Sequence, residues 1–259
     1  MYPDAFVSYG YANEKSWLIK FWRFLNTKAY THAENIYTIS NSMSNKLKDV
    51  GHVVKTIPMW ADTHSIKPIN KEANWFRNEL QLNEKFVVLY SGNFGETHDL
   101  ESVIQAAIDL KDIDYIHFLF IGDGKKKKML RSKIKDYNLT NVKVLPFQNE
   151  QKFPYSITSG DVSIVTLDEK AAELSVPSKV FYYMAAGSAI ITVSHPKSEL
   201  AQLVEKYSCG FNISGGRQMK LADCIIKLSK DSGLLEDLKQ NSRRASKFHS
   251  PDNVKNIVI

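Results

Sequence analysis

Two glycine-rich turns are the first places where this sequence could bind a phosphate. Gly92, Asn93 and Gly95 come directly after one apolar run, and Gly122 and Gly124 follow a second. Glycines between a strand and a helix let the backbone approach a ligand, and free N–H groups at the helix start favour an anion. The spacing is not G-x-G-x-x-G, so a dinucleotide cofactor is not the first expectation. Turns whose glycines serve only the backbone geometry would look the same.

A lysine at the start of an apolar helix also points to a phosphate. Ser178 is well placed as the N-cap of that helix, and Lys179 lies in its first turn. A cation there opposes the helix dipole unless an anion is also bound. Lys179 is therefore expected to meet a diphosphate, with an ordinary solvated lysine as the alternative. The four lysines from Lys125 to Lys128 are expected to form a solvated helix face rather than a binding patch.

Other side chains that could do chemistry are scattered. Glu199 follows another apolar run, where its carboxylate could accept hydrogen bonds from sugar hydroxyls or cap the helix that it begins. His98, His117 and His249 have no spacing typical of a metal site or a catalytic triad. The two cysteines form neither a disulfide framework nor a metal-ligand pattern. We therefore predict no metal site, and the residues identify no catalytic group.

From Phe86 onward, the chain alternates short apolar runs with amphipathic segments. This alternation predicts successive βα units and a doubly wound α/β domain around a parallel sheet. The predicted strands are Phe86–Ser91, Tyr115–Ile121, Val142–Leu145, Val162–Thr166, Ala189–Val193 and Gly210–Ile213. The predicted helices are Leu100–Leu110, Lys126–Tyr137, Lys179–Ala186, Glu199–Tyr207, Met219–Leu228 and Gly233–Phe248.

The first 67 residues are predicted to be the last part of another α/β domain. An aromatic-rich helix over Trp17–Tyr30 precedes a buried strand over Asn35–Ile39, a helix over Ser42–Val50 and a strand over Val53–Ile57. Prolines in the segment that follows indicate a linker, so we place a boundary between residues 1–67 and residues 68–259. A layer of two strands is marginal by itself in water. We therefore expect partner strands that precede this segment to be missing.

Composition narrows the partners. A net charge of +6 and a pI near 9.0 favour an anionic partner such as a nucleoside diphosphate, a phospholipid surface or a nucleic acid. Nucleic acid is not expected, because no recognition helix and no stacking aromatics on basic strands are visible. The scarcity of cysteine and the lack of an apolar run of about 20 residues favour a cytoplasmic protein without a membrane span.

Several of these segments resemble glycosyltransferase family 4, whose members have the GT-B fold, two Rossmann-like domains facing each other across a cleft. The segments similar to the donor domain are Leu89–Asn93, Phe118–Gly124, Val142–Phe147 and Pro177–Gly187, and those similar to the end of the N-terminal domain and its linker are Ile36–Leu47 and Val54–Asp62. Among the branches of the family, bacterial surface-polysaccharide transferases similar to the N-acetylfucosamine transferases match best.

The resemblance implies transfer of a sugar, with retention and without a bound metal or cofactor, from a nucleoside diphosphate sugar, UDP foremost. The acceptor would be a polysaccharide or a lipid-linked saccharide, with a peripheral contact at the inner face of the membrane. The resemblance places the diphosphate near Gly92, Asn93, Gly95 and His98, the base near Phe147, and the phosphates or donor sugar near Ser178, Lys179 and Glu199.

The sequence also departs from the family pattern. Asn93 and His98 stand where many relatives carry arginine and lysine, and the paired glutamates of the family fall at Leu174 and Tyr182. Tyr2-Pro3-Asp4 resembles a point well inside the N-terminal domain, so most of an acceptor domain is expected to be absent. Self-association or docking to a separate N-terminal half would follow. A non-catalytic nucleotide-sugar-binding fragment and, less favoured, a sugar-nucleotide epimerase are the alternatives.

Overall fold

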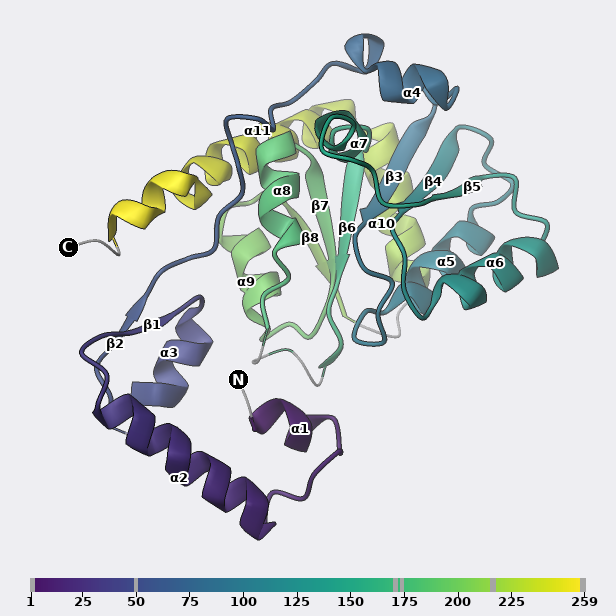
Figure 1. Ribbon diagram of the computed structural model, residues 1–259. Helices are drawn as coiled ribbons and strands as arrows, with labels where there is room; N and C mark the ends of the chain where they lie inside the picture. Colours follow the sequence, from purple (N-terminus) through teal and green to yellow (C-terminus); the bar gives the residue numbers. More distant parts are fainter. Residues whose placement is uncertain (1–2, 49–50, 170–171, 173–174, 215–217, 257–259) are drawn as a thin grey trace.

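The computed structural model describes residues 3–48, 51–169, 172, 175–214 and 218–256, which form a large unit and a small one (Figure 1). The large unit is built on a six-stranded sheet with the order β5-β4-β3-β6-β7-β8. Every neighbouring pair of its strands is parallel, as predicted. The strands are β3 (Phe86–Ser91), β4 (Ile116–Ile121), β5 (Val142–Leu145), β6 (Val162–Thr166), β7 (Ala189–Val193) and β8 (Gly210–Ile213).

Helices cover both faces of this sheet, which is why its strands read as nearly continuous apolar runs. On one face, Val88 and Phe118 point into a core shared with α5 (Leu100–Asp109), α6 (Lys127–Asp136) and α10 (Gln218–Lys230). On the other face, Val87 and Leu119 point toward α8 (Lys179–Ala186), α9 (Glu199–Lys206) and the end of α11 (Ser232–Ser246). Two short helices, α4 (Trp75–Glu79) and α7 (Phe153–Ile157), are absent from the sequence prediction because five residues show no helical period.

The strand order decides where a ligand can bind. Counted along the chain, the sheet runs third, second, first, fourth, fifth, sixth, so the order reverses between β3 and β6. The helix after β3 covers one face, and α8, which follows β6, covers the other. In doubly wound sheets of this kind, a crevice opens at the carboxyl ends of the two strands where the order reverses.

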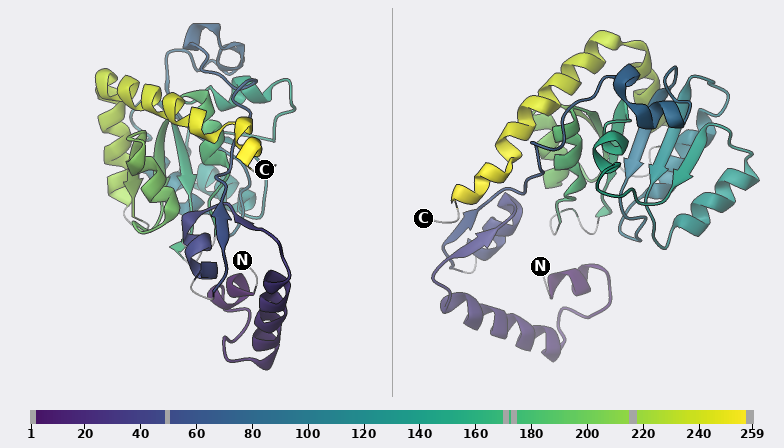
Figure 2. Two further views of the ribbon diagram at one scale, coloured as in Figure 1. Left: turned by 90° about the vertical axis from the view of Figure 1, so that its left-hand side faces the viewer. Right: turned by 45° about the horizontal axis from the view of Figure 1, so that its top comes forward.

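The small unit lies at one end of the large one (Figure 2). It contains α1 (Asp4–Ser8), α2 (Trp17–Thr31), β1 (Ile36–Thr38), α3 (Asn41–Lys48) and β2 (Val54–Thr56), with β1 and β2 paired in parallel. The prediction of a buried strand at Asn35–Ile39 is wrong in its burial, because Ile36 and Tyr37 are only partly covered and Ile39 is exposed. A sheet of two strands with few covering helices cannot bury both of its faces.

A linker and the C-terminal helix hold the two units together. The linker rises from β2 to the short 3₁₀ helix η1 (Lys71–Ala73) and passes close to α11 (Figure 1). The Arg243 guanidinium on α11 donates from Nη1 to the Ile66 carbonyl at 3.1 Å and to the Ala185 carbonyl at 2.7 Å. Beyond α11, the chain continues through η3 (Lys247–His249) and η4 (Pro251–Asn256), where the His249 carbonyl accepts from the Ala61 amide at 3.1 Å.

Candidate functional site

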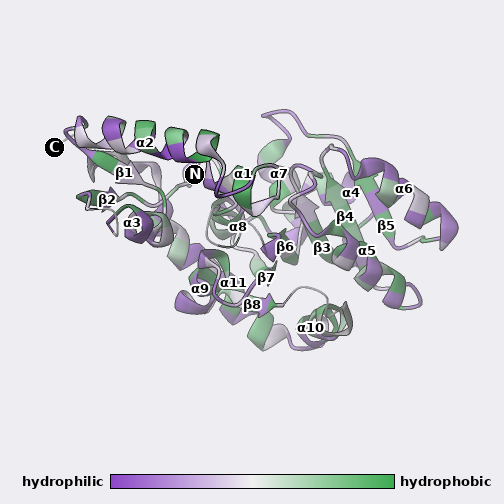
Figure 3. Cartoon of the chain, turned by 90° about the horizontal axis from the view of Figure 1, so that it is seen from below, coloured by the Kyte–Doolittle hydropathy of each residue, from purple (hydrophilic) through white to green (hydrophobic). Residues whose placement is uncertain are grey.

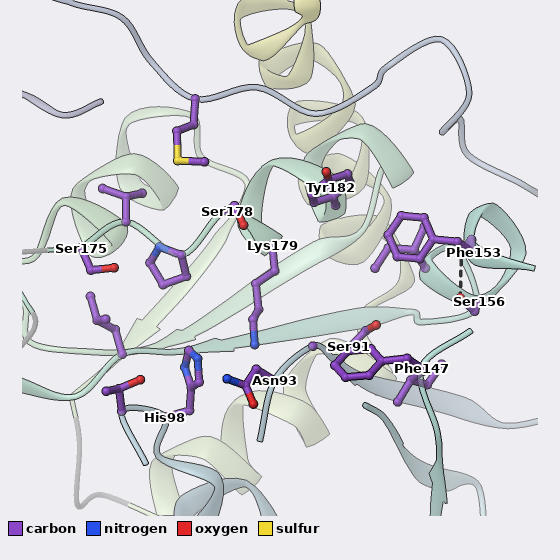
Figure 4. Close-up of a pocket in the computed structure, with 18 of the residues that line it drawn as sticks. Ser91, Asn93, His98, Phe147, Phe153, Ser156, Ser175, Ser178, Lys179 and Tyr182 are labelled. Atoms are coloured by element: carbon purple, nitrogen blue, oxygen red, sulfur yellow. Dashed lines mark hydrogen bonds between the residues drawn. The ribbon is translucent and has the colours of Figure 1, made fainter. Parts of the chain in front are cut away.

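A pocket of about 610 Å³ lies at the carboxyl ends of the strands, where the strand order reverses. Its wall includes residues that follow β3, β5 and β6 and the first turns of α8. Tyr9 and Met59 add a contribution from the small unit and the linker. Figure 4 shows Lys179 reaching into the middle of the pocket, with Phe147, Phe153 and Tyr182 to one side and Ser175 to the other.

Lys179 sits in an environment that disfavours its positive charge. Its Nζ donates to the Tyr90 hydroxyl at 2.8 Å and lies 4.0 Å from the centroid of the Tyr90 ring. Among the described residues it forms no ion pair with a carboxylate. Burial lowers the pKa of Lys179 to about 7. A partly buried lysine without a counter-charge is suited to receive an anionic ligand.

The two glycine turns stack on each other beneath this lysine. The Gly92 amide donates to the Ile121 carbonyl at 2.8 Å, and the Phe94 amide donates to the Asp123 carbonyl at 2.8 Å. Gly92 has φ +141°, and a Cβ there would lie 2.9 Å from Lys179 Nζ. A Cβ on Gly122 would lie only 1.9 Å from the Gly92 carbonyl oxygen, so the second turn requires glycine in order to seat the first. Gly92 and Asn93 line the pocket, whereas the described lining does not include Gly95.

Two buried tyrosines fix the backbone that leads into the first turn. The Ser91 amide donates to the Tyr183 hydroxyl at 2.7 Å, and this hydroxyl donates in turn to the Ser91 carbonyl at 3.2 Å. The Tyr90 hydroxyl donates to the Asn93 carbonyl at 3.1 Å while accepting from Lys179. The sequence analysis did not predict a role for either tyrosine. Tyr90 directly precedes the glycine turn and Tyr183 lies on the apolar helix α8, and these two positions are the sequence features that could have indicated their role.

His98 also lines this pocket, and its side chain is neutral. Burial, reinforced by the charge of Lys179, lowers the pKa of His98 to about 4, so the ring is uncharged at neutral pH. Its Nδ1 is 2.9 Å from the Thr166 carbonyl, which can only accept, so Nδ1 carries the proton. Nε2 is then a hydrogen-bond acceptor. It can receive a hydroxyl donor such as a sugar, and it cannot neutralise a phosphate.

One end of the pocket is aromatic. Phe147 is 56% exposed, so much of its ring is open to a ligand. Phe153 and Tyr182 meet edge to face, with ring centroids 5.6 Å apart and an interplanar angle of 82°. All three line the pocket. Such an end can take a flat, uncharged ring such as a nucleobase.

Tyr9 brings a polar atom to this pocket from the small unit. Its hydroxyl is buried, and the described residues give it no hydrogen-bond partner. Burial raises the pKa of Tyr9, and the nearby Asp168 carboxylate raises it further, so the phenol stays protonated. Tyr9 is therefore placed to donate a hydrogen bond to a bound molecule. No sequence motif marks this position.

Glu199 does not take the expected role at the pocket. Its carboxylate accepts from the Asn41 amide at 3.0 Å and from the Ser42 amide at 3.3 Å, so it caps the start of α3 in the small unit. The described lining does not include it. The cap of its own helix is Ser198, whose Oγ accepts from the Ala201 amide at 3.1 Å. The unpaired N–H groups at the start of α3 and the dipole of that helix stabilise the negative charge of the Glu199 carboxylate, which explains this position.

Ser178 lines the pocket, is exposed and occupies the N-cap position of α8 as predicted, but its side chain makes no capping hydrogen bond. Its backbone is already helical, with φ −57° and ψ −26°, and its hydroxyl makes no capping bond. Helical bonding starts one residue earlier, because the Val180 amide donates to the Pro177 carbonyl at 3.2 Å. The hydroxyl of Ser178 is therefore available to a ligand.

The lysine run is occupied by neighbouring acids. Lys125 pairs with Glu96 at 3.1 Å, and Lys126 pairs with Glu101 at 2.8 Å. Lys125 is 77% exposed, as expected for a solvated helix face, whereas Lys126 is only 18% exposed and also donates to the His98 carbonyl at 2.7 Å. Within the described ranges, no three or more His, Cys, Asp and Glu side chains gather as metal ligands would. In the same part of the chain, every helix is too short or too polar to cross a bilayer. Leu174, one of the two positions where the paired glutamates of the family would fall, lies outside the described residues.

Comparisons with known proteins agree with this geometry. The family model described as Glycosyl transferases group 1 matches residues 71–245. WcaI of Escherichia coli K12, whose name assigns it to colanic acid biosynthesis as a glycosyl transferase, is 32% identical over 181 residues, which are 68% of this chain and 44% of WcaI. WbjE of Pseudomonas aeruginosa, named as a glycosyltransferase, is 24% identical over 88% of this chain and 58% of WbjE. The chain thus spans about half the length of these relatives.

Solved structures share the fold as well. Alr3699/HepE of Anabaena, crystallised with UDP, superimposes with a TM-score of 0.79 at 19% identity. The match covers 95% of this chain and 68% of that chain, so it includes both the large and the small unit. At this level of identity the likeness establishes the architecture.

Proposed function

Because the chain belongs to the Glycosyl transferases group 1 family, which has the GT-B fold, we propose that its pocket binds a nucleoside diphosphate sugar as the donor for sugar transfer. UDP is the first nucleotide to test, since the similar Anabaena protein was solved with UDP and with UDP-glucose. Within this proposal, residues 68–259 form the donor-binding domain, and residues 1–67 are the last part of an acceptor-side domain.

The observation that carries the proposal is the position of Lys179. It is a partly buried amine with a lowered pKa and no described carboxylate partner, and it lies between an aromatic end and a polar end of one pocket. A diphosphate beneath Lys179, next to Gly92 and Asn93, would place the base toward Phe147. The sugar would then lie toward His98, whose neutral Nε2 accepts a hydroxyl proton.

The same arrangement supplies the chemistry of the transfer. An acceptor hydroxyl would form a new bond to the anomeric carbon as the bond between the sugar and the diphosphate breaks. Negative charge develops on the leaving phosphate, which takes up the proton of the acceptor hydroxyl. Lys179 and the free N–H groups at the start of α8 can stabilise that charge electrostatically. We propose retention at the anomeric carbon, as the family resemblance implies. The acceptor would be a polysaccharide or a lipid-linked saccharide at the inner face of the membrane, as the family resemblance implies. WcaI is named for colanic acid biosynthesis.

Calorimetric titration with UDP tests this assignment. The unaltered chain should bind UDP, and Lys179→Ala should weaken binding by about ten- to 150-fold, the range for a hydrogen bond to a charged group. The control is Lys125→Ala, whose side chain is 77% exposed and paired with Glu96. It should keep the affinity within about twofold. No binding of UDP, GDP or dTDP by the unaltered chain, or equal losses in the two variants, would refute the proposal.

A second candidate function is a donor-binding subunit that docks onto a partner. The exposed apolar side chains along α2 favour it, because a protein that acts alone rarely leaves such a stripe in water. Measuring the release of UDP from UDP-sugar distinguishes these two candidate functions. A catalytic chain releases UDP from UDP-sugar in the presence of lipid-linked saccharide, whereas a docking subunit binds the donor without turnover.

A further inference from the structure

We propose that a second pocket, at the opposite edge of the large sheet from the donor pocket, binds a small phosphate monoester that carries hydroxyl groups, which is the chemistry of a sugar phosphate. This inference goes beyond the proposed function and does not depend on it. The second pocket has a volume of about 510 Å³. Small-molecule sites occupy about 300–1,000 Å³, so the cavity has the size for such a ligand.

The second pocket lies at the amino ends of the strands. Gly160 and Asp161, which line it, directly precede β6, and Gly187 lies between the end of α8 and the start of β7. The rest of its wall comes from the linker with η1 and from one face of α11, which pass close to each other (Figure 1). The described linings of the two pockets share no residue, so a ligand can occupy one pocket while the other is filled.

Arg243 of α11 lines the second pocket, and no carboxylate of the described residues forms an ion pair with it. Its guanidinium donates to three carbonyls, those of Ile66 at 3.1 Å, Ala185 at 2.7 Å and Thr63 at 3.4 Å. A guanidinium has five N–H donors, so two remain without a described partner. Burial lowers the pKa of Arg243, yet an arginine stays protonated. A bound anion would supply the missing negative charge.

Two more cations line the pocket from the same face of α11. Lys239 lies four residues before Arg243, and Gln240 lies four residues before Arg244, so these side chains project together. Arg244 donates only to neutral amide oxygens of Gln240 at 3.3 Å and Asn241 at 3.5 Å. Within the described part of the chain, Lys239 pairs with no carboxylate either. Convergent guanidinium and ammonium groups of this kind suit a phosphate.

The other two cations of the lining are already engaged by a buried acid. Asp161 is 1% exposed, and its Oδ2 accepts from Arg77 Nη1 at 3.2 Å and from the Val87 amide at 2.8 Å. Its Oδ1 lies 2.8 Å from Lys71 Nζ. These contacts fasten η1 and α4 to the start of β6. The phosphate therefore belongs on the α11 side of the pocket.

The acidic side chains of the lining limit which anion fits. Five basic and three acidic side chains give the lining a net charge of +2: Lys71, Arg77, Lys239, Arg243 and Arg244 against Glu72, Asp161 and Glu236. A phosphate monoester carries about −1.5 to −2 at pH 7, which this lining balances. A polyphosphate or a nucleic acid would bring more negative charge than the lining offsets. Carboxylates such as Glu72 and Glu236 accept from hydroxyl groups, so the ligand should carry hydroxyls beside its phosphate.

The test uses the full chain labelled with ¹⁵N and titrated with glucose 6-phosphate while its amide signals are followed by NMR. The amides of Gly160 and Gly187 report on the second pocket, and the amide of Gly92 reports on the donor pocket. We expect the Gly160 and Gly187 signals to shift saturably, with the same midpoint when UDP is present in excess. Inorganic phosphate lacks the hydroxyls and glucose lacks the charge, so each should bind at least about fivefold more weakly.

Lys239→Gln combined with Arg244→Gln should weaken binding of glucose 6-phosphate by about tenfold or more, because both charge-assisted contacts are lost. The matched control is Lys230→Gln combined with Lys247→Gln. It removes the same charge at two exposed side chains outside the described linings of both pockets. It should keep the affinity within about twofold.

Each outcome bears on a different statement. Gly160 and Gly187 signals that do not shift saturably would overturn the inference and leave donor binding intact. Equal losses in the two double variants would show that bulk charge attracts the phosphate, and would also overturn the site. Equal affinities for glucose 6-phosphate and inorganic phosphate would overturn the sugar-phosphate assignment. Absence of a Gly92 shift with UDP would refute the proposed function alone.

Discussion

Lys179 shows how a single residue can couple ligand binding to protonation. Its pKa is lowered from the usual 10.5 to about 7 because burial disfavours the charged form. Lys179 Nζ contacts the ring face and the hydroxyl of Tyr90, and neither group carries a negative charge that could neutralise the ammonium. A diphosphate would provide that charge and would return the pKa of Lys179 toward its usual value.

The sign of the coupling follows from these two pKa values. Between about pH 7 and pH 10 the free protein holds Lys179 mostly neutral, and a diphosphate bound next to it would favour the charged form. Binding of UDP at pH 8.5 should therefore take up about one proton. Titrations in two buffers with different ionisation enthalpies measure this number. Lys179→Arg, which stays charged throughout, should bind without uptake. Zero uptake by the unaltered chain would show that Lys179 does not meet the phosphates.

Glu199 shows at the element scale how the two units are joined. Its carboxylate accepts from the first N–H groups of α3, and it thereby links α9 of the large unit to α3 of the small one. A negative charge at a helix start contributes about 0.3–1 kcal/mol, and more in partly buried geometry. Tyr9 of the small unit and Met59 of the linker line the pocket, whereas Glu199, Asn41 and Ser42 are not part of its described lining. Glu199 is therefore a structural link between the two units rather than a sugar ligand.

Hydrogen exchange distinguishes these roles of Glu199. In Glu199→Ala, the Asn41 and Ser42 amides should exchange about five- to tenfold faster, corresponding to the loss of about 1 kcal/mol of local stability. The affinity for UDP should change by less than about twofold. Lys197→Ala, on the same exposed segment, is the control and should leave both amides as they are. A fall in UDP-sugar affinity with unchanged exchange would restore the sugar contact that the sequence suggested.

At the scale of the whole molecule, helix α2 stands out because several of its large apolar side chains are not covered by the rest of the described chain. Figure 3 shows hydrophobic segments along this helix, at the edge of the small unit. Leu18, Phe21, Trp22 and Leu25 recur at helical spacing and line an apolar groove of about 440 Å³ together with Phe6. All of them are exposed. Contiguous apolar surface of this kind marks a protein interface.

We expect a second copy of the chain to cover this groove, because a twofold-symmetric contact pairs the same apolar surface on both copies. Sedimentation should detect dimers at micromolar concentrations. Replacing Phe21 and Leu25 with serine should weaken the dimer by about tenfold or more, since each buried side chain contributes about 1.5–3 kcal/mol. Tyr137→Ser, at an exposed aromatic residue that directly follows α6, is the matched control. A chain that stays monomeric at every concentration would contradict this expectation.

Local sequence determined most of the large unit. The six strands and their intervening helices agree with the predicted ranges to within a few residues, because apolar periodicity is a property of a short window. The same reasoning found Gly92, Asn93 and Lys179, since parallel strands bring the segments that follow them to one edge of the sheet, and the family resemblance added Phe147. The family resemblance, carried by those segments, is confirmed by the family match.

Tertiary structure alone decided what these residues can do. The lowered pKa of Lys179 depends on burial, and the hydrogen bond from Ser91 to Tyr183 joins residues 92 positions apart. Glu199 meets Asn41 across 158 positions, which turned a predicted sugar ligand into a helix cap. No local pattern contains such information, because desolvation and partner choice are set by whichever distant segment packs against a side chain. The sequence therefore located the pocket, and only the packed chain assigned charge and partners within it.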